Sequence, residues 1–505
     1  MKKVTPVKKI LISILATFTA MVAMKFFLDF RKELKRVKAS AGFTPARFDL
    51  RDMGWASGAR QQAWGTCWIF STYSSLESNL LINKGWEKAG EKGLVDLAEY
   101  HMDKFNSFTR KGDEQHVKSD WYSGQGENFP GGNHDDLNSG VVVHLGGDYR
   151  MATAILSNNR GAVQERLVPT IKGHSDQKIF GDTPWEGVLL ENDYTYFVPK
   201  DVEYLTLFGS DENKREAIKK AIVRYGAVAS TQNMDDTPVG ITKEGMEIHM
   251  YRGKDKMNHA ISLIGWDDDF KFKEHKGAWL VKDSDHKDEK TGKHIGYFWV
   301  LYDDVHVGKD PYMGGVSFRG VAKRTYDRAY THAYHGWRYS TGDDGKVKSV
   351  GTSFNLKDGE KIHSIGVYTT SLDVKVQLEI YSEINGVLLK KIEEEFYYPG
   401  FHRIDLKRPL DVGPKKKVFV VQKNSDNSYA YDASFTLDVL LSELPKWGEP
   451  IDINSKASLN ESFFHDGRSW IDFASYKNSR NGQMLNKHAA SNDTASVALN
   501  VYTVK

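Results

Sequence analysis

The spacing of apolar residues behind position 67 is that of a helix. Four apolar residues fall at i, i+4, i+7 and i+11, so that they share one face of a helix. They are Ile69, Tyr73, Leu76 and Leu80. Gly65 and Thr66 stand directly in front and are expected to supply the turn and the cap of this helix.

Other helices and strands are predicted before residue 330. Residues 211–225 have an amphipathic helical pattern and lead into a buried strand at 226–229. Residues 145–157 join Gly146 and Gly147 to a helix with an apolar face. Apolar runs that predict core strands follow at 257–270, 277–287 and 296–304.

From Val350 onward the pattern changes to short stretches in which apolar and polar residues alternate, separated by Gly, Asp and Asn. Strands at this spacing predict an antiparallel β-sandwich. Residues 461–473 add a hairpin with Asp466 and Gly467 at its turn, and residues 495–504 add a last strand.

Length and composition predict a large, ordered protein. A chain of 505 residues is too long for one ordinary core, so two or more domains are expected. The 69 basic and 67 acidic residues leave a net charge of +2, which suggests neither nucleic-acid binding nor attraction to strongly anionic surfaces.

The N-terminus is typical of an exported protein. Paired lysines precede an apolar run at 10–23, which is short for a membrane span and of the right length for a signal peptide. An uncleaved membrane anchor is the alternative, because the cleavage site is poor. An exported chain without disulfides also suggests a bacterial source.

Residues 103–140 are polar and rich in glycine, and we interpret them as a long loop. Their Asp, Asn and His residues lack a fixed ligand spacing, so a solvated loop is favoured over a metal site. No metal ligand and no cofactor is predicted anywhere in the chain.

Cys67 is the only cysteine of the chain, and it falls on the first turn of the predicted helix. Backbone N–H groups and the helix dipole favour a thiolate at such a position, which would make Cys67 a nucleophile. A buried structural cysteine is the alternative, because free cysteines often pack as small apolar side chains.

The residues around Cys67 favour catalysis. Gln61 precedes the cysteine by six residues, Gly65 by two, and Trp68 follows it. This arrangement resembles the papain-like cysteine peptidases. The resemblance implies that Gln61 and the backbone N–H of Cys67 form an oxyanion hole. Trp64 stands where the family usually has a half-cystine.

The resemblance extends to two later segments. His259 begins the strand at 257–270 and is followed by Ala260, as in the papain pattern, so it is the expected base. Asp283 stands where the family usually has an asparagine, and Ser284 is retained. Asp285 replaces the tryptophan that would cover the His259 contact. Two consequences are open: Asp283 over-stabilises the charged pair with His259, or Asp283 is more hydrated than its counterpart.

Three small residues are candidates for contact with substrate. Gly146 and Gly147 correspond to a glycine pair that lines the substrate cleft in papain relatives, where an extended peptide approaches the backbone. A simple turn that begins the helix is the alternative reading of this pair. Ala260 is the third candidate, because it follows the expected base.

The second half of the chain resembles the lectin-like module that follows the peptidase in some prokaryotic papain relatives. A sugar site would need an exposed aromatic ring with polar neighbours. Trp337, Trp447 and Trp470 are available, but each could equally be part of the core, so no binding residue is assigned. The alternative role of this half is a rigid platform for the catalytic domain.

The sequence therefore predicts an α+β fold in which a two-lobed papain-like domain precedes an antiparallel β-sandwich. Expected boundaries are 1–42 for the signal peptide or anchor, 43–327 for the peptidase and 328–505 for the lectin-like domain. The expected activity is that of an exported, secreted or surface-anchored cysteine endopeptidase. Its partners would be a peptide substrate and, through the second domain, a glycan.

Two alternatives stay open. A weakened papain-like scaffold could serve as a carbohydrate-binding or surface-binding protein. A Cys-His-Asp set also occurs in acyl transferases that join proteins, although Gln61 and Trp68 favour the papain interpretation.

Overall fold

The computed structural model describes most of the chain outside its N-terminus. The described residues are 44–62, 65–104, 146–158, 161–167, 194–235, 238–287, 292, 294–341, 345–437, 451–453, 455, 457–474 and 496–505. The predicted export segment, most of the predicted loop at 103–140 and Trp447 lie outside them. Among the described residues, no helix is long and apolar enough to cross a membrane.

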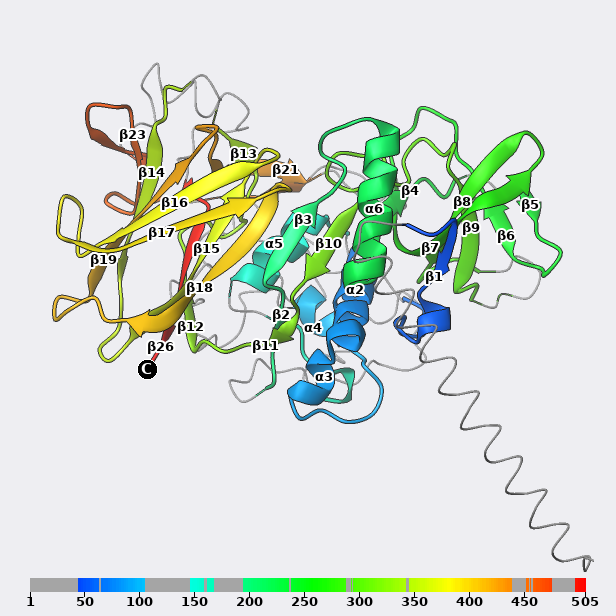
Figure 1. Ribbon diagram of the computed structural model, residues 1–505, viewed down its shortest axis with the longest axis horizontal. Helices are drawn as coiled ribbons and strands as arrows, with labels where there is room; N and C mark the ends of the chain where they lie inside the picture. Colours follow the sequence, from blue (N-terminus) through cyan, green and yellow to red (C-terminus); the bar gives the residue numbers. More distant parts are fainter. Residues whose placement is uncertain are drawn as a thin grey trace, which may run out of the picture.

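The first half of the chain combines helices with a mainly antiparallel sheet (Figure 1). Its α-helices are α2 (Cys67–Asn83), α3 (Gly85–Lys88), α4 (Glu99–Lys104), α5 (Tyr149–Ser157) and α6 (Asp211–Tyr225). Its strands are β1 (Arg47–Asp49), β2 (Phe197–Val198), β3 (Asp201–Tyr204), β4 (Val228–Gln232), β5 (Gly240–Ile241), β6 (Glu247–His249), β7 (His259–Phe272), β8 (His275–Lys282), β9 (Tyr297–Leu301), β10 (Val316–Arg319) and β11 (Ala322–Lys323).

Several of these elements confirm the sequence pattern. Helix α6 has the predicted bounds, and the side chain of Ser210 caps it by accepting a hydrogen bond from the N–H of Asn213. The helix predicted to follow Gly146 and Gly147 begins at Tyr149, and the side chain of Asp148 caps it. The strand predicted at 226–229 is shifted and becomes β4.

Two apolar cores divide the first half into two lobes. One core is built around α2 and α5, and the other around β7, β8, β9 and the inner face of α6. Strand β7 lies at the junction, with Ala260 in the first core and Ile261 in the second. The predicted two-lobed arrangement is therefore present, and β7 brings the strand lobe against α2.

The second half is a β-sandwich. Its strands are β12 (Arg328–Tyr330), β13 (Tyr339–Ser340), β14 (Ser349–Asn355), β15 (Lys361–Thr369), β16 (Val374–Tyr381), β17 (Leu388–Phe396), β18 (Gly400–Leu410), β19 (Lys417–Asn424), β20 (Ala430–Asp432), β21 (Phe435–Leu437), β22 (Ile451–Ile453), β23 (Ser462–His465), β24 (Trp470–Asp472), β25 (Ser496–Val497) and β26 (Leu499–Val504).

The core of the sandwich is filled from two sheets. The sheet β17-β16-β19-β14-β23-β24 and the strands β12-β26-β15-β18 supply most of its buried side chains, among them Val376, Val420 and Ile365. The predicted hairpin at 461–473 is confirmed, since β23 pairs with β24 across a turn that contains Asp466 and Gly467. Alternation along each strand thus predicted the sandwich correctly.

The two halves share one sheet, which the sequence pattern did not predict. Strand β18 pairs with β3, and Gly400 stands opposite Glu203. A Cβ at Gly400 would lie 1.9 Å from the carbonyl oxygen of Val202, so only glycine fits this contact. The predicted boundary between 327 and 328 falls between β11 and β12, and it stays a prediction because the sheet continues across the two halves.

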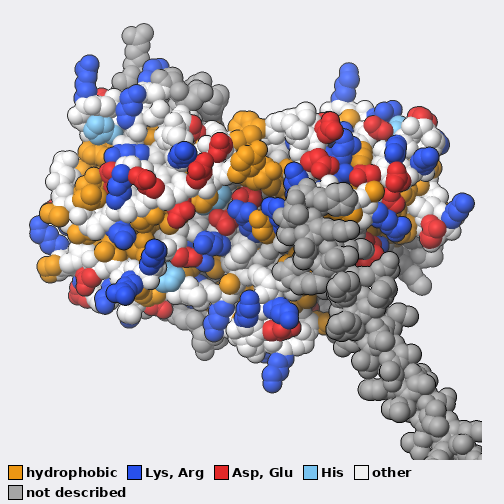
Figure 2. All heavy atoms as spheres, viewed as in Figure 1, with side chains coloured by type: hydrophobic (Ala, Val, Ile, Leu, Met, Phe, Trp, Pro, Cys, Tyr) orange, Lys and Arg blue, Asp and Glu red, His pale blue; other side chains and the backbone are white. Residues whose placement is uncertain are grey.

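Charges of both signs are mixed over the molecular surface. Figure 2 shows Lys and Arg side chains interspersed with Asp and Glu over both halves of the face in view. This distribution agrees with the near-neutral net charge of +2.

Candidate active site

Cys67 is the first residue of α2 and is buried, with 3% of its surface exposed. Thr66 is the N-cap residue, and its carbonyl oxygen accepts hydrogen bonds from the N–H groups of Ile69 and Phe70. Thr66 therefore stands at the predicted cap position, although its side chain makes no capping hydrogen bond. The position of Cys67 at the helix N-terminus is confirmed.

His259 is the first residue of β7, and Asp283 directly follows the last residue of β8, so the two residues lie together at the open end of this hairpin. Nε2 of His259 is 2.6 Å from Oδ1 of Asp283, and 4% and 3% of the two residues are exposed. The other carboxylate oxygen, Oδ2, accepts hydrogen bonds from the N–H groups of Asp285 and His286. The expectation of a more hydrated Asp283 was therefore wrong, since these contacts hold the carboxylate away from solvent.

The imidazole of His259 also joins Cys67 to Asp283. Burial alone would lower the pKa of His259, but Asp283 and a hydrogen bond with Cys67 outweigh burial and raise this pKa well above its usual value. Burial would raise the pKa of Asp283, but His259 and the two backbone N–H groups lower it to about 2. These contacts favour a charged imidazolium at His259 beside a charged Asp283.

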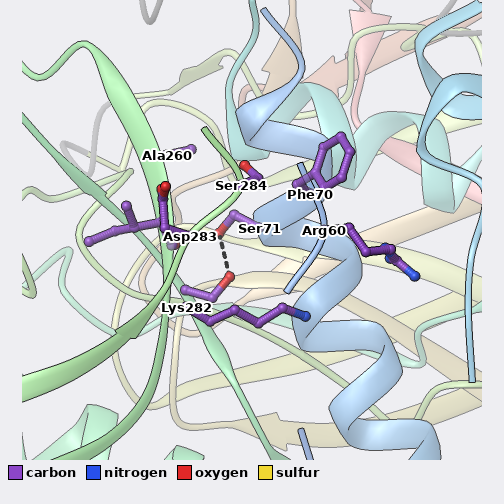
Figure 3. Close-up of a pocket in the computed structure, with 9 residues that line it drawn as sticks. Arg60, Phe70, Ser71, Ala260, Lys282, Asp283 and Ser284 are labelled. Atoms are coloured by element: carbon purple, nitrogen blue, oxygen red, sulfur yellow. Dashed lines mark hydrogen bonds between the residues drawn. The ribbon is translucent and has the colours of Figure 1, made fainter. Parts of the chain in front are cut away.

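A pocket lies between α2 and the ends of β7 and β8 (Figure 3). Its lining residues are Arg60, Phe70, Ser71, Ala260, Ile261, Ser262, Lys282, Asp283 and Ser284. The hydroxyl of Ser71 donates a hydrogen bond to the carbonyl oxygen of Ile261 and so ties α2 to β7. Ala260 lies in the pocket wall and is almost fully buried.

The two glutamines before Cys67 have different surroundings. Gln61 is exposed, whereas Gln62 is buried. The N–H of Gln62 donates to the carbonyl oxygen of Ser284 (2.7 Å), and the hydroxyl of Ser284 donates to Oε1 of Gln62 (2.7 Å). Gln62 therefore ties the segment before Cys67 to the segment that carries Asp283. The sequence analysis did not single out Gln62, although this residue is adjacent to the candidate Gln61.

Gly146 and Gly147 lie just before α5 and are buried. A Cβ at Gly147 would lie 2.6 Å from the indole ring of Trp68, the residue after Cys67. Gly146 has a φ of +105°, in the region that favours glycine. The absence of a side chain at position 147 thus lets the backbone contact Trp68, and contact with substrate at this pair stays a prediction.

A group of largely buried charged side chains lies beside the site. Arg60 contacts Glu77 (2.8 Å) and Glu99, and Nζ of Lys282 contacts the hydroxyl of Ser57 (2.8 Å), which in turn donates to Glu77. Burial lowers the pKa of Lys282 to about 8, although Glu77 opposes this shift. The group links the segment that leads to Gln61 with α2, α4 and β8, and sequence reasoning did not find it because its members lie far apart in the chain.

The described tryptophans of the second half are not free surface rings. Trp337 is 3% exposed, donates from Nε1 to the hydroxyl of Ser340, and packs edge-on against Tyr204 of the first half. Trp470 is half-buried and packs against Phe419 and His465. Trp337 therefore belongs to the contact between the two halves.

The comparisons with known families agree with this geometry. Residues 147–312 match the family model described as papain family cysteine protease, and residues 329–484 match the model described as lectin like domain. The first match includes His259 and Asp283 and begins after Cys67. The chain is a papain-like cysteine peptidase with a C-terminal lectin-like domain.

Two solved structures share this two-domain fold. One contains the cysteine protease and lectin-like domains of Cwp84, a surface layer associated protein of Clostridium difficile, with 19% identity and a TM-score of 0.63 over 92% of this chain and 89% of that chain. The other is a cysteine-to-alanine variant of the clostridial cysteine protease Cwp84 after propeptide cleavage, with 21% identity and a TM-score of 0.63 over 91% and 99% of the two chains. The search of curated proteins gives no significant match.

Proposed function

We propose that the chain is an exported cysteine endopeptidase in which Cys67 is the nucleophile and His259 is the acid and base. The observation that carries this proposal is the position of the His259 ring, which hydrogen-bonds Cys67 and Asp283 at once. Nε2 faces Asp283, so Nδ1 is the ring nitrogen left to exchange a proton with the thiol.

The reaction proceeds through an acyl-enzyme. The Cys67 thiolate attacks the carbonyl carbon of the peptide, a C–S bond forms, and the C–N bond breaks as His259 gives its proton to the leaving amine. His259 then takes a proton from water, the oxygen of that water attacks the thioester carbon, and the C–S bond breaks, which releases the carboxylic acid and restores the Cys67 thiolate beside the His259 imidazolium. Asp283 stays charged throughout and orients the imidazole.

Developing negative charge on the carbonyl oxygen needs hydrogen-bond donors. The N–H of Cys67, at the first position of α2, has no acceptor within the helix and is one such donor. The amide of Gln61 is the other proposed donor, because its side chain is exposed within the segment that leads to Cys67. Gln62 and Ser284 position this segment relative to Asp283.

The place of action that we propose is the bacterial cell surface or its surroundings. The structurally similar Cwp84 is a surface layer associated protein, and the predicted signal or anchor segment at 1–42 agrees with export. The lectin-like domain would present the peptidase to its substrate as a rigid platform, because β18 extends the peptidase sheet. Glycan binding by this domain is a further proposal, which a glycan array tests directly.

The decisive experiment compares the unaltered protein with Cys67→Ala and Cys67→Ser. Both variants are expected to lose hydrolysis of a protein substrate while keeping the unaltered melting temperature. An epoxide that alkylates papain-type thiols should label only the unaltered protein. Equal activity of Cys67→Ala and the unaltered protein would refute the proposal.

Analysis of the products separates hydrolysis from acyl transfer. Hydrolysis gives new amino termini, whereas transfer between proteins gives cross-links and ammonia. New amino termini without cross-links are the expected result.

A further inference from the structure

A histidine and carboxylate cluster lies next to the His259 and Asp283 pair. Glu247 and His249 are alternate residues of β6, so their side chains leave the same face of the strand. His286 comes from the segment after β8, three residues beyond Asp283. In the part of the chain that the structure describes, these three side chains are the one such group close enough to share an ion.

The three ligand atoms lie close together. Oε2 of Glu247 is 2.9 Å from Nε2 of His249 and 2.6 Å from Nε2 of His286, and all three atoms lie within 4.8 Å of one another. A tetrahedral ion with bonds of about 2.0–2.1 Å needs neighbouring ligand atoms about 3.3 Å apart. Small rotations of the side chains would therefore open the space for an ion.

The donor set selects the class of ion. Two imidazole nitrogens and one carboxylate oxygen are the ligands of zinc and similar transition metals, and three such ligands leave a fourth position for water. Calcium and magnesium prefer oxygen ligands alone. The nearby carboxylate of Asp283 adds negative charge beside His249.

The surroundings hold the ligands in place. Phe298 of β9 packs against the rings of His249 and His286, with centroids 4.4 Å and 5.8 Å away. Ile248, between the two β6 ligands, pairs with Trp299 of β9. Both backbone polar groups of His286 are hydrogen-bonded. Its N–H donates to Asp283, and its carbonyl oxygen accepts from the N–H of Ile295 (2.7 Å).

We propose that Glu247, His249 and His286 form a binding site for a zinc-type divalent cation. The site is separate from the catalytic thiol and shares a segment with Asp283, since the N–H of His286 donates to Oδ2 of that carboxylate over 2.6 Å. A bound ion would therefore hold residues 283–286 in the conformation that orients His259. The alternative is a cluster without metal, in which Glu247 accepts hydrogen bonds from both rings.

Calorimetric titration with zinc and absorption spectra with cobalt test this site. The titrations use the full chain with Cys67→Ala, because a catalytic thiol and imidazole would themselves bind such ions. One equivalent of zinc should bind, and cobalt should give the absorption bands of a tetrahedral site. Adding Glu247→Gln or His286→Ala should weaken binding by at least about tenfold.

The controls separate loss of a ligand from loss of the fold. His306→Ala removes a partly exposed histidine outside the cluster and should leave zinc binding unchanged. Glu247→Gln keeps the size of the side chain and its hydrogen-bond acceptor, and its melting temperature without metal checks the fold. Absence of zinc binding at about 100 micromolar, or binding that neither cluster substitution weakens, would refute the site. Neither result would refute the proposed peptidase activity, which is tested separately at Cys67.

Discussion

Oδ1 of Asp283 lies 2.6 Å from Nε2 of His259, so a carboxylate occupies the third position of the site. A carboxylate stabilises imidazolium more than an amide does, and the pKa of His259 is accordingly raised. Asp283→Asn keeps the hydrogen bond and removes the charge. We expect this variant to retain activity or to gain it, and the alkaline limb of its pH profile for kcat/KM to move to lower pH.

The pair of His259 and Asp283 should also make the stability of the protein depend on pH. The contribution of His259 is complete below its unfolded pKa near 6.5 and is lost as pH rises through the raised folded value. The contribution of Asp283 is present above its unfolded pKa of 3.8 and is lost as pH falls through about 2. Urea unfolding should therefore find Asp283→Asn less stable than the unaltered protein at pH 5, with a smaller difference near pH 2. An unchanged alkaline limb together with equal stability at pH 5 would contradict this account.

A side chain at position 147 is expected to destabilise the protein. A Cβ added to Gly147 would lie 2.6 Å from the Trp68 ring, and overpacking of this kind costs about 1–3 kcal/mol. Gly147→Ala should lower the free energy of unfolding by such an amount and slow the alkylation of Cys67, because Trp68 is the next residue of α2. Gly58→Ala is the matched control, since a Cβ there meets no atom within 4 Å. Equal alkylation rates in the two variants would show that the Trp68 contact does not position Cys67.

Within the buried charge group, substitution of Glu77 should lower the free energy of unfolding most. Glu77 is fully buried, and although burial would raise its pKa, Arg60 and Lys282 lower it. Glu77→Gln leaves two buried cations with too little negative charge, which is expected to cost about 3–5 kcal/mol of unfolding free energy.

Glu91→Gln is the control for Glu77→Gln. It removes the partner of the exposed Arg166 and should cost at most about 1 kcal/mol. Urea unfolding measures both values. A loss at Glu77 no larger than that at Glu91 would mean that Glu99 and Asp96 balance the positive charge without Glu77.

Local sequence predicted the parts of the site whose signal lies in consecutive residues. Cys67 was recognisable from Gln61 and Trp68, and His259 from the apolar strand that it begins. The β-sandwich could be predicted from the alternation of apolar and polar residues along each strand. A strand that buries one face places an apolar residue at every second position. These features depend on neighbours in the chain, which a sequence displays directly.

Contacts between distant segments carried no such signal. Glu247 and His249 meet His286 only because β6 pairs with β9 and the chain returns after β8. Gln62 meets Ser284 for the same reason, although the two are 222 residues apart. The sequence did not predict the sheet that the two halves share. This sheet depends on the pairing of β18 with β3, and the alternation of apolar and polar residues along a strand does not specify which strand it pairs with.

A buried ion pair between Asp148 and Arg338 joins the two halves of the chain. Oδ2 of Asp148 is 3.0 Å from Nη1 of Arg338, and 3% and 1% of the two side chains are exposed. Oδ1 of Asp148 also accepts a hydrogen bond from the N–H of Met151 and so caps α5. One carboxylate therefore fixes both the start of α5, directly after Gly147, and the first loop of the lectin-like half.

Arg338→Met should destabilise the whole chain and disturb the active site as well. It leaves Asp148 buried with much of its charge uncompensated, for which about 3–5 kcal/mol of unfolding free energy is expected. Because α5 adjoins the contact of Gly147 with Trp68, alkylation of Cys67 should slow in parallel. Lys415→Met, which breaks the exposed pair with Glu383, should change the free energy by at most about 1 kcal/mol. Urea unfolding and alkylation rates measured on the same samples test the link, and a destabilised Arg338→Met with an unchanged alkylation rate would show that the lectin-like half stabilises the chain without positioning Cys67.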